Sequence, residues 1–263
     1  MKNLLTIAGS DSSGGAGIQA DLKTFAALGV YGMSVITAVT AQNTQGVERV
    51  EEISREMVKA QIDAVFNDIP VDAVKIGMVS NPEIIQQIAL SLKDWKAINI
   101  VVDPVMVSKS GYHLLKPEAI ETLKKELLPL ARVVTPNLPE VKAMLGWEVT
   151  DEERMESAAQ EIFSLGLESV LIKGGHLEGA ANDLLFDGKD LTWFKSPRLN
   201  KKNTHGTGCT LSAAIAAHLA LGYDLMTAVE KSKSYLSGAI EHSFPLGHGV
   251  GPVHHFYRFF KEL

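Results

Sequence analysis

The sequence predicts one α/β domain spanning residues 1–263, in which helices cover both faces of a mostly parallel sheet. Short runs that are apolar almost throughout alternate with longer segments whose apolar residues recur at helical spacing. Strands of that kind belong in a parallel sheet that is buried on both faces. Hydrophobic residues make up 46% of the chain, enough for one large core, and no linker or internal repeat divides it.

The predicted elements follow in a regular order. An apolar strand at 3–8 meets a glycine-rich loop at 9–17, and a helix at 18–28 ends at Gly29. We then expect strands at 34–39, 73–76, 98–102, 133–135 and 170–173, and helices at 55–66, 82–92, 117–128 and 155–165. Segments 183–186 and 192–196 flank a turn, which predicts an antiparallel hairpin at the sheet edge. Two alanine-rich amphipathic helices, at 207–221 and 225–240, are expected to pack side by side over the sheet.

The charge composition argues against several partners. The chain carries 25 Lys and Arg against 31 Asp and Glu, so it lacks the basic excess that binding to a phosphate backbone needs. A single cysteine, Cys209, allows no internal disulfide. The sequence shows neither a leader pattern nor an apolar run of the roughly 20 residues that cross a membrane. We therefore expect a cytoplasmic protein that binds neither nucleic acid nor membrane.

Ligands of open parallel sheets bind beyond the carboxyl ends of the strands, where this chain concentrates glycine and polar residues. The loop at 9–17 could bring backbone amides against a phosphate, or could form tight turns only. It lacks the Gly-Lys-Ser/Thr ending of a Walker A motif. Gly14-Gly15-Ala16-Gly17 approximates the dinucleotide fingerprint only loosely.

The segment 203–210 precedes an alanine-rich helix and predicts an anion-binding turn. The free amides of Thr207, Gly208 and Cys209 would point outward at a helix N-terminus, where the dipole carries roughly half a positive charge. Such donors stabilise the charge on a γ-phosphate during transfer. A thiol at a helix N-terminus has a lowered pKa, so Cys209 could serve as a base; a small buried hydrophobic residue is the alternative.

Three further strand ends carry candidate residues. Asp103 could hold a metal or a hydroxyl, and Lys109 after it could close over phosphates as part of a lid or remain solvated. Asn137 and Glu140 have the spacing of a helix capping box. Lys173, which two glycines follow, suits either a phosphate contact or a turn.

Two other features favour ordinary structural explanations. The adjacent side chains of His254 and His255 do not converge on one metal ion, and no third ligand is evident. Lys201 and Lys202 are expected to be a solvated pair in a loop.

In this order the loops resemble the ribokinase superfamily, and within it the hydroxymethylpyrimidine and phosphomethylpyrimidine kinases of thiamine synthesis. The resemblance covers nearly the whole chain, and its motifs are specific only together. They are Thr6-Ile7-Ala8-Gly9-Ser10-Asp11, Ser13-Gly14-Gly15-Ala16-Gly17-Ile18-Gln19-Ala20-Asp21-Leu22-Lys23, Thr135-Pro136-Asn137-Leu138-Pro139-Glu140, Lys173-Gly174-Gly175-His176, the turn at 206–210, and Gly249-Val250-Gly251-Pro252-Val253-His254-His255.

The resemblance implies a ribokinase-like three-layer sandwich that uses ATP and Mg²⁺. Gly206, Thr207 and Gly208 would stabilise the transferring phosphate. Most superfamily members place an Asp base after this turn, whereas this chain has Cys209, as in the pyrimidine-kinase branch, where the thiol is taken to face the acceptor hydroxyl. The implied ATP-binding residues are Asn137, Lys173, Thr204, His205 and Lys233, and the implied metal neighbourhood is Asp103 and Glu140.

The same resemblance implies an acceptor pocket for a small pyrimidine, made by Gly9, Ala16, Asp21, Gln42, Met78 and Val105. The Gln42 amide offers a donor and acceptors that can pair with the edge of an aminopyrimidine. Pyridoxal kinases of the same branch are the close alternative, and similar enzymes often carry a methionine at this position and a second cysteine in the lid. This chain has Gln42 and Ser108 instead, which favours the pyrimidine, with side activity on pyridoxal.

Two hypotheses from other classes stay open. A nicotinamide oxidoreductase would use 14–17 as its dinucleotide loop, but it leaves the turn at 206–210 unexplained. A silent sensor would bind the pyrimidine or ATP without catalysis. The resemblance also implies a homodimer, and Val35, Ile36 and Val39 could lie in its interface or in a buried strand.

Overall fold

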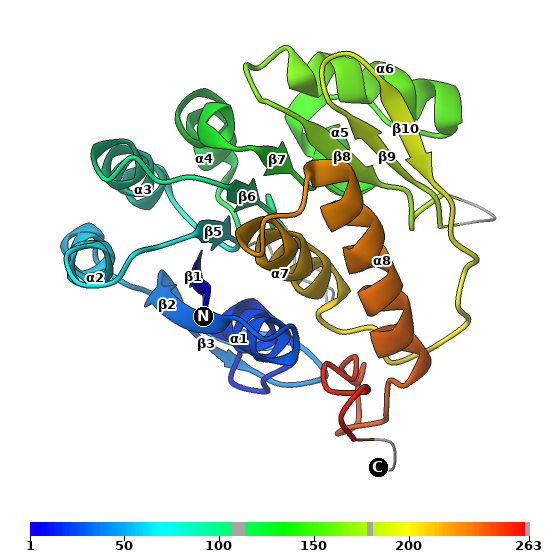
Figure 1. Cartoon of the computed structure of the whole chain (residues 1–263), viewed down its shortest axis with the longest axis horizontal. Coiled ribbons are helices and arrows are strands. Elements are labelled where there is room, and N and C mark those ends of the chain that lie inside the picture. Colours follow the sequence, from blue (N-terminus) through cyan, green and yellow to red (C-terminus); the bar gives the residue numbers. More distant parts are fainter. Residues whose placement is uncertain (107–113, 178–180, 261–263) are drawn as a thin grey trace.

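The computed structural model describes residues 1–106, 114–177 and 181–260. Within these residues an eight-stranded sheet has the order β10-β9-β8-β7-β6-β5-β1-β2 (Figure 1). Strands β2, β1, β5, β6, β7 and β8 are mutually parallel, and β9 and β10 form an antiparallel hairpin at one edge. The bounds are β1 Asn3–Ala8, β2 Tyr31–Ile36, β5 Ala73–Ile76, β6 Ile100–Val102, β7 Val133–Val134, β8 Val170–Lys173, β9 Asp183–Phe186 and β10 Leu191–Phe194.

Helices cover both faces of this sheet, as the sequence predicts (Figure 1). On one face α2 (Arg55–Phe66), α3 (Pro82–Asp94), α4 (Pro117–Thr122), α5 (Leu138–Leu145) and α6 (Glu152–Phe163) enclose one apolar core. On the other face α1 (Gly17–Ala27), α7 (Thr207–Ala220) and α8 (Leu225–Glu241) enclose a second. The three-layer α/β prediction and the edge hairpin are therefore confirmed.

Side-chain caps fix several helix starts. Ser54, Asn81, Asp151 and Asp224 each accept a hydrogen bond from a backbone amide in the first turn of the helix that follows. The predicted capping box is present: Asn137 Oδ1 accepts from the Glu140 amide at 2.9 Å, and Glu140 Oε2 accepts from the Asn137 amide at 2.8 Å. The box turns the chain sharply between the end of β7 and α5.

One sheet was missed by the sequence analysis. The strand predicted at 34–39 is right only in part. Residues 34–36 belong to β2, which ends at Ile36, and the chain then forms a separate antiparallel pair, β3 (Ala38–Gln42) with β4 (Val47–Glu52). This pair is largely exposed, and its sequence lacks the apolar runs that mark the central strands. Val35 is fully buried in the core, whereas Val39 is 48% exposed on β3.

The helix predicted at 117–128 also differs. The α-helical turns of α4 end at Thr122, a π-helical turn occupies Leu123–Leu127, and a 3₁₀ turn closes the segment at Leu128–Leu130. Pro129 has no amide hydrogen to continue the α-helical ladder, which explains the irregular end.

Among the helices that the structure describes, none combines the length and apolarity needed to cross a membrane.

Candidate active site

A cavity of about 500 Å³ opens beyond the carboxyl ends of β1, β5, β6, β7 and β8. This is the position that the sheet topology favours for a ligand. Among the described residues, every residue that the resemblance places in the site lines the cavity except Asp21 and Lys233. The lining residues are Gly9, Ser10, Asp11, Ala16, Gly17, Gln42, Met78, Asp103, Val105, Met106, Leu114, Asn137, Pro139, Glu140, Ala143, Lys173, His176, Thr204, His205, Gly206, Thr207, Gly208 and Cys209.

The predicted anion turn is formed at the start of α7. Gly206 adopts a left-handed conformation, with φ of +82°, and the first α-helical bond runs from the Thr210 amide to the Gly206 carbonyl at 2.9 Å. The amides of the three residues before Thr210 therefore have no acceptor within the helix. A Cβ built at Gly208 would lie 3.5 Å from both Asp103 Oδ2 and Lys173 Nζ, so the turn faces these two charged groups.

The charged centre beside the turn is a buried cluster. Lys173 Nζ donates to Asp103 Oδ1 at 2.8 Å and lies 4.0 Å from Glu140 Oε2. Thr135 and Ser212 hydroxyls also donate to Asp103, at 3.2 and 3.3 Å. Burial opposes ionisation of Asp103, but the charges of Lys173 and Lys75 and the hydrogen bonds from Lys173 and Thr135 together outweigh it and lower the pKa of this carboxyl.

Glu140 responds in the opposite direction. Burial raises the pKa of its carboxyl to about 7, and the ammonium of Lys173 opposes this shift only in part. The nearby Asp103 carboxylate adds to the increase. No group of three or more acidic, histidine or cysteine side chains that could hold a metal occurs among the residues described.

Cys209 lies in the cavity wall as predicted, but the prediction that its helix N-terminus lowers the thiol pKa is wrong. Burial raises the pKa of the Cys209 thiol to about 11. The Lys75 ammonium opposes this shift, while the carboxylates of Asp21 and Asp103 add to it. Desolvation of the thiolate is the largest cause of the raised pKa.

Asp21 does not line the cavity. Its side chain is completely buried, and its Oδ2 accepts from the Thr6 hydroxyl at 2.6 Å and from Lys75 Nζ at 2.9 Å. Its Oδ1 has no hydrogen-bond partner among the described residues. The structure therefore places Asp21 in a buried ion pair on the α1 side of the sheet, outside the lining of the cavity.

Lys233 also lies outside the cavity wall. Its Nζ donates to Asp183 Oδ2 at 2.5 Å, and Asp183 Oδ1 accepts from the Gly174 amide at 2.9 Å. Lys233 thereby supports the chain immediately after Lys173. Any contact between Lys233 and a nucleotide would require this ion pair to open.

The acceptor candidates line the same cavity as the charged cluster. Gln42 ends β3, and its backbone amide and carbonyl both bond to the Ser12 hydroxyl, at 2.8 and 2.7 Å. Met78 packs closely against the strand-end glycine, because a Cβ at Gly9 would lie 2.8 Å from its Sδ. Sequence reasoning missed β3 as a separate element, although Asn43-Thr44-Gln45-Gly46 carries the residues of a turn.

The C-terminal motif supports the anion turn from outside. The His205 amide donates to the Gly251 carbonyl at 3.0 Å, and the Gly251 amide donates to Asn203 Oδ1 at 3.1 Å. His255 Nε2 bonds to the Thr210 hydroxyl at 3.1 Å, and both His254 and His255 are buried. The structural explanation of this histidine pair is consistent with these contacts.

Lys109 and Ser108 lie outside the described residues.

Known proteins are similar to this chain in sequence and in fold. The model of the family described as phosphomethylpyrimidine kinase matches residues 11–254. The hydroxymethylpyrimidine/phosphomethylpyrimidine kinase of Rhizobium meliloti is 57% identical over 98% of both chains.

Solved structures agree with this assignment. A phosphomethylpyrimidine kinase of Clostridium difficile is 54% identical, with a TM-score of 0.82 over 91% of this chain and 100% of that one. A pyridoxal kinase of Bacillus subtilis, solved as an ADP complex, is 41% identical, with a TM-score of 0.92 over 99% of this chain and 100% of that one. The extent of the family match, together with the identity to the Rhizobium kinase, shows that the chain belongs to the phosphomethylpyrimidine kinase family.

Proposed function

We propose that the protein transfers the γ-phosphoryl group of ATP to the hydroxymethyl group of 4-amino-5-hydroxymethyl-2-methylpyrimidine, and then phosphorylates the monophosphate to the diphosphate, in thiamine biosynthesis. The observation that carries the proposal is the convergence on one cavity of a helix-N-terminal glycine turn, a buried lysine and the side chain of Gln42. The family membership supports the same reaction.

The phosphate end of the reaction is assigned to the anion turn and Lys173. The amides of Thr207, Gly208 and Cys209 would donate to the oxygens of the γ-phosphoryl group as its charge redistributes. Gly206 makes the turn possible, because its φ of +82° is unfavourable for any residue with a Cβ. Phosphoryl transfer has a loose transition state, so positioning supplies most of the rate acceleration.

The rest of the nucleotide is assigned to Asn137, Thr204 and His205, which line the same cavity. Mg²⁺ fits the carboxylates of Asp103 and Glu140, since this ion usually binds one or two carboxylates together with substrate phosphates. When bound, it would neutralise charge on the phosphates. Burial raises the pKa of Glu140, and a cation bound nearby would shift this carboxyl back toward its ionised form.

The acceptor is assigned to Gly9, Ala16, Gln42, Met78 and Val105. The Gln42 amide can donate to a ring nitrogen and accept from an exocyclic amino group, while Met78 and Val105 supply apolar contacts to the faces of the ring. This pairing requires the 4-amino group of the pyrimidine, which pyridoxal lacks. The substrate class therefore follows from an amide at position 42.

Cys209 would face the acceptor hydroxyl as a neutral thiol. With a pKa of about 11 it is mostly protonated at neutral pH, so only a small fraction of the enzyme carries the thiolate. That thiolate is the form that can accept the hydroxyl proton and become a thiol, and a loose transition state lets the hydroxyl lose this proton late. Removal of such a base costs roughly 10² to 10⁴ in rate.

The test is ADP release with Mg²⁺-ATP and one of four additions: the hydroxymethylpyrimidine, its monophosphate, pyridoxal, or no acceptor. Turnover with both pyrimidines and little with pyridoxal supports the full proposal. Turnover with only one pyrimidine restricts the reaction to that phosphorylation. If pyridoxal is the best acceptor, the phosphate site stands and the acceptor assignment falls.

Pyridoxal phosphorylation is the second candidate, and the TM-score of 0.92 to the pyridoxal kinase of Bacillus subtilis is the observation that favours it. The same assay distinguishes a silent sensor, since a sensor would bind the pyrimidine without forming ADP.

Cytoplasmic residence and a homodimer complete the proposal. Light scattering on the purified protein tests the dimer, and a monomer at micromolar concentration would contradict it.

A further inference from the structure

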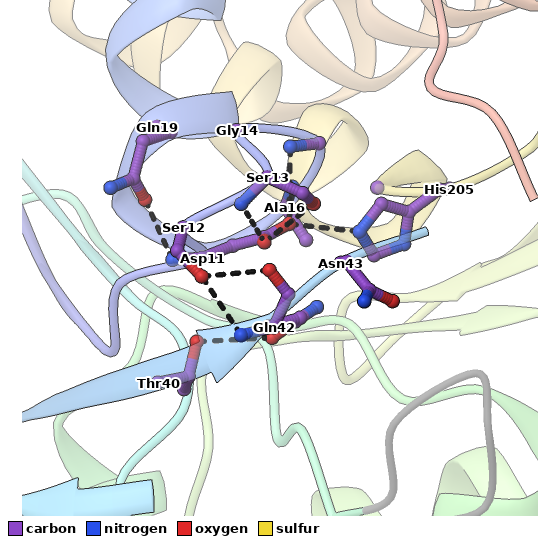
Figure 2. Close-up of polar contacts among 12 residues, drawn as sticks. Asp11, Ser12, Ser13, Gly14, Ala16, Gln19, Thr40, Gln42, Asn43 and His205 are labelled. Atoms are coloured by element: carbon purple, nitrogen blue, oxygen red, sulfur yellow. Dashed lines mark hydrogen bonds and ion pairs between the residues drawn. The ribbon is translucent and has the colours of Figure 1, made fainter. Parts of the chain in front are cut away.

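Asp11 carries a carboxylate that no step of the proposed reaction uses. Its side chain is only 2% exposed, although it stands in the loop that follows β1. Oδ1 accepts from the Ser13 amide at 2.9 Å and the Ser13 hydroxyl at 2.7 Å. Oδ2 accepts from the amides of Gly15 and Ala16, at 3.1 and 2.8 Å, and bonds to His205 Nε2 at 2.8 Å (Figure 2).

Four of these contacts lie within the loop, and the fifth, to His205, joins it to a segment almost 200 positions away in the sequence. Ser13, Gly15 and Ala16 belong to the loop that begins α1, and Ala16 lines the acceptor side of the cavity. His205 immediately precedes Gly206, the residue that opens the anion turn. One buried carboxylate therefore anchors the acceptor loop and the phosphate turn together.

The two segments also meet directly through their backbones. A Cβ at Gly206 would lie 1.8 Å from the Gly15 carbonyl oxygen, and a Cβ at Gly15 would lie 2.2 Å from His205 Cδ2. Neither approach leaves room for a side chain at these positions. A small shift of either segment would therefore displace the other.

The same loop holds the strand that carries Gln42 (Figure 2). The Ser12 hydroxyl bonds to both backbone groups of Gln42, and the Thr40 hydroxyl donates to the Ser10 carbonyl at 2.8 Å. The Ser10 amide donates to the Ala38 carbonyl at 2.8 Å. Residues 10–13 thus connect the wall that would select the acceptor with the turn that would hold the phosphate.

We propose that Asp11 is a positioning residue that, through His205, holds the anion turn in register with the acceptor wall. The effect on turnover rests on the proposed kinase function. The positioning of the anion turn by Asp11 does not, because it is a relationship within the protein itself. A misplacement of about 1 Å between reacting groups costs on the order of 100-fold in rate. Loss of the contact should therefore lower kcat more than it changes the KM of either substrate.

The first variants are Asp11→Asn and a matched pair at His205. Asparagine at position 11 keeps the shape but replaces one accepting oxygen with a donor, so it cannot serve all five contacts. In His205→Gln the side-chain amide nitrogen can occupy the place of Nε2 and keep the bond to Asp11, whereas in His205→Asn it cannot reach that place. Asp187→Asn is the control, since Asp187 accepts two amides in the β9–β10 turn, away from the cavity.

We expect kcat to fall about 10- to 100-fold in Asp11→Asn and in His205→Asn, with the KM of the acceptor within about threefold of wild type. The KM of ATP should also stay within about threefold in Asp11→Asn, whereas His205 is itself assigned to the nucleotide. His205→Gln should have a higher kcat than His205→Asn, and Asp187→Asn should match wild type. The kcat of the double variant Asp11→Asn/His205→Asn should be within about threefold of the kcat of the slower single variant, because both substitutions remove the same contact between Asp11 and His205. Multiplied effects in the double variant, or a kcat within threefold of wild type in both single variants, would overturn the proposal.

Amide hydrogen exchange across 204–208 gives a readout that needs no acceptor. Exchange should be faster in Asp11→Asn and in His205→Asn than in wild type, and unchanged in His205→Gln. If Asp11→Asn does not fold, the pair at His205 decides the question alone. If wild type turns over no acceptor, the proposed function fails while exchange still tests Asp11; unchanged exchange in His205→Asn would overturn the inference itself.

Discussion

The Lys75 ammonium lies 2.9 Å from the Asp21 carboxylate, and both side chains are completely buried between the central sheet and α1. Burial by itself lowers the pKa of Lys75, but Asp21, together with Cys209 and Asp103, more than offsets it, and the net shift is upward. The Thr6 hydroxyl completes the group from β1, where Thr6 stands in register with Lys75 of β5. The pair is thus a structural element beneath the cavity.

Removal of one partner of this pair should destabilise the fold strongly. Lys75→Met leaves the Asp21 carboxylate buried without its counter-ion, and we expect the free energy of unfolding to fall by about 3–5 kcal/mol. Urea denaturation measures the change. The double variant Asp21→Asn/Lys75→Met should recover part of the loss, because it leaves no buried charge unpaired.

The matched control is Lys59→Met, which breaks the exposed pair between Lys59 and Asp63 on α2. It should cost less than about 1 kcal/mol. Asp21→Asn also decides between two roles for this residue. A loss of pyrimidine affinity at unchanged stability would restore Asp21 to the substrate site.

The thiol of Cys209 should react slowly at neutral pH. Alkylation needs the thiolate, and a pKa of about 11 leaves very little of it at pH 7. The rate with iodoacetamide should therefore rise about tenfold per pH unit from pH 7 to 9.5 without reaching a plateau. Because the chain has one cysteine, the measurement reports this group alone.

A cysteine peptide, with a pKa of about 8.5, is the reference and should approach its plateau in the same range. A plateau for the protein near pH 7 would show instead that the helix N-terminus lowers the pKa of the thiol.

Cys209→Ala should lower turnover by roughly 10² to 10⁴ with pyrimidine affinity nearly unchanged. Activity within threefold of wild type would remove Cys209 from the role of base.

Glu140 should make stability depend on pH. Its carboxyl has a pKa raised from about 4.5 to about 7 by burial, so between these values the folded state keeps a proton that the unfolded state has lost. This contribution to stability is fully present below pH 4.5 and disappears as pH rises through 7. Wild type should therefore lose stability relative to Glu140→Gln over this range, on the order of 3 kcal/mol.

Urea midpoints measured from pH 4.5 to 8 test this difference. Glutamine can keep the capping-box contact to Asn137, so the variant should fold. Glu148→Gln, an exposed substitution, is the control and should leave the pH slope of wild type unchanged. Parallel slopes for wild type and Glu140→Gln would show that the carboxyl is ionised throughout.

The sequence predicted the parts of this molecule that depend on local pattern. The central strands, the edge hairpin, the capping box at Asn137 and the turn at Gly206 all follow from apolar periodicity or from residues that suit particular backbone conformations. The pair β3–β4 was missed because half-exposed strands with few apolar residues resemble loops.

Contacts and pKa shifts that depend on residues distant in sequence could not be predicted from such local patterns. The thiol pKa of Cys209 depends on burial by segments distant in sequence, so the helix-terminus rule alone gave the wrong direction. The contact of Asp11 with His205 joins residues 194 positions apart, and no local motif indicates it. Lys75 did leave a signal: a lysine within an apolar central strand requires a buried counter-ion, although the strand does not say which carboxylate supplies it.

Gln42→Met should change which acceptor the enzyme prefers. Methionine offers no group that pairs with the edge of an aminopyrimidine, and loss of one or two hydrogen bonds should lower kcat/KM for the hydroxymethylpyrimidine by about 10- to 100-fold. Pyridoxal does not need this pairing, so its kcat/KM should change by less than about threefold. The ratio of the two kcat/KM values, measured by ADP release, is the quantity to compare.

Gln45→Met, at an exposed position in the turn between β3 and β4, is the matched control and should leave the ratio unchanged. If Gln42→Met lowers both kcat/KM values equally, the side chain shapes the cavity wall without selecting the acceptor. The backbone contacts with Ser12 would then account for its importance, because they survive the substitution and fix the end of β3 whatever side chain it carries. A changed ratio shows instead that recognition belongs to the amide itself, since the wall is held by the same backbone bonds in both proteins.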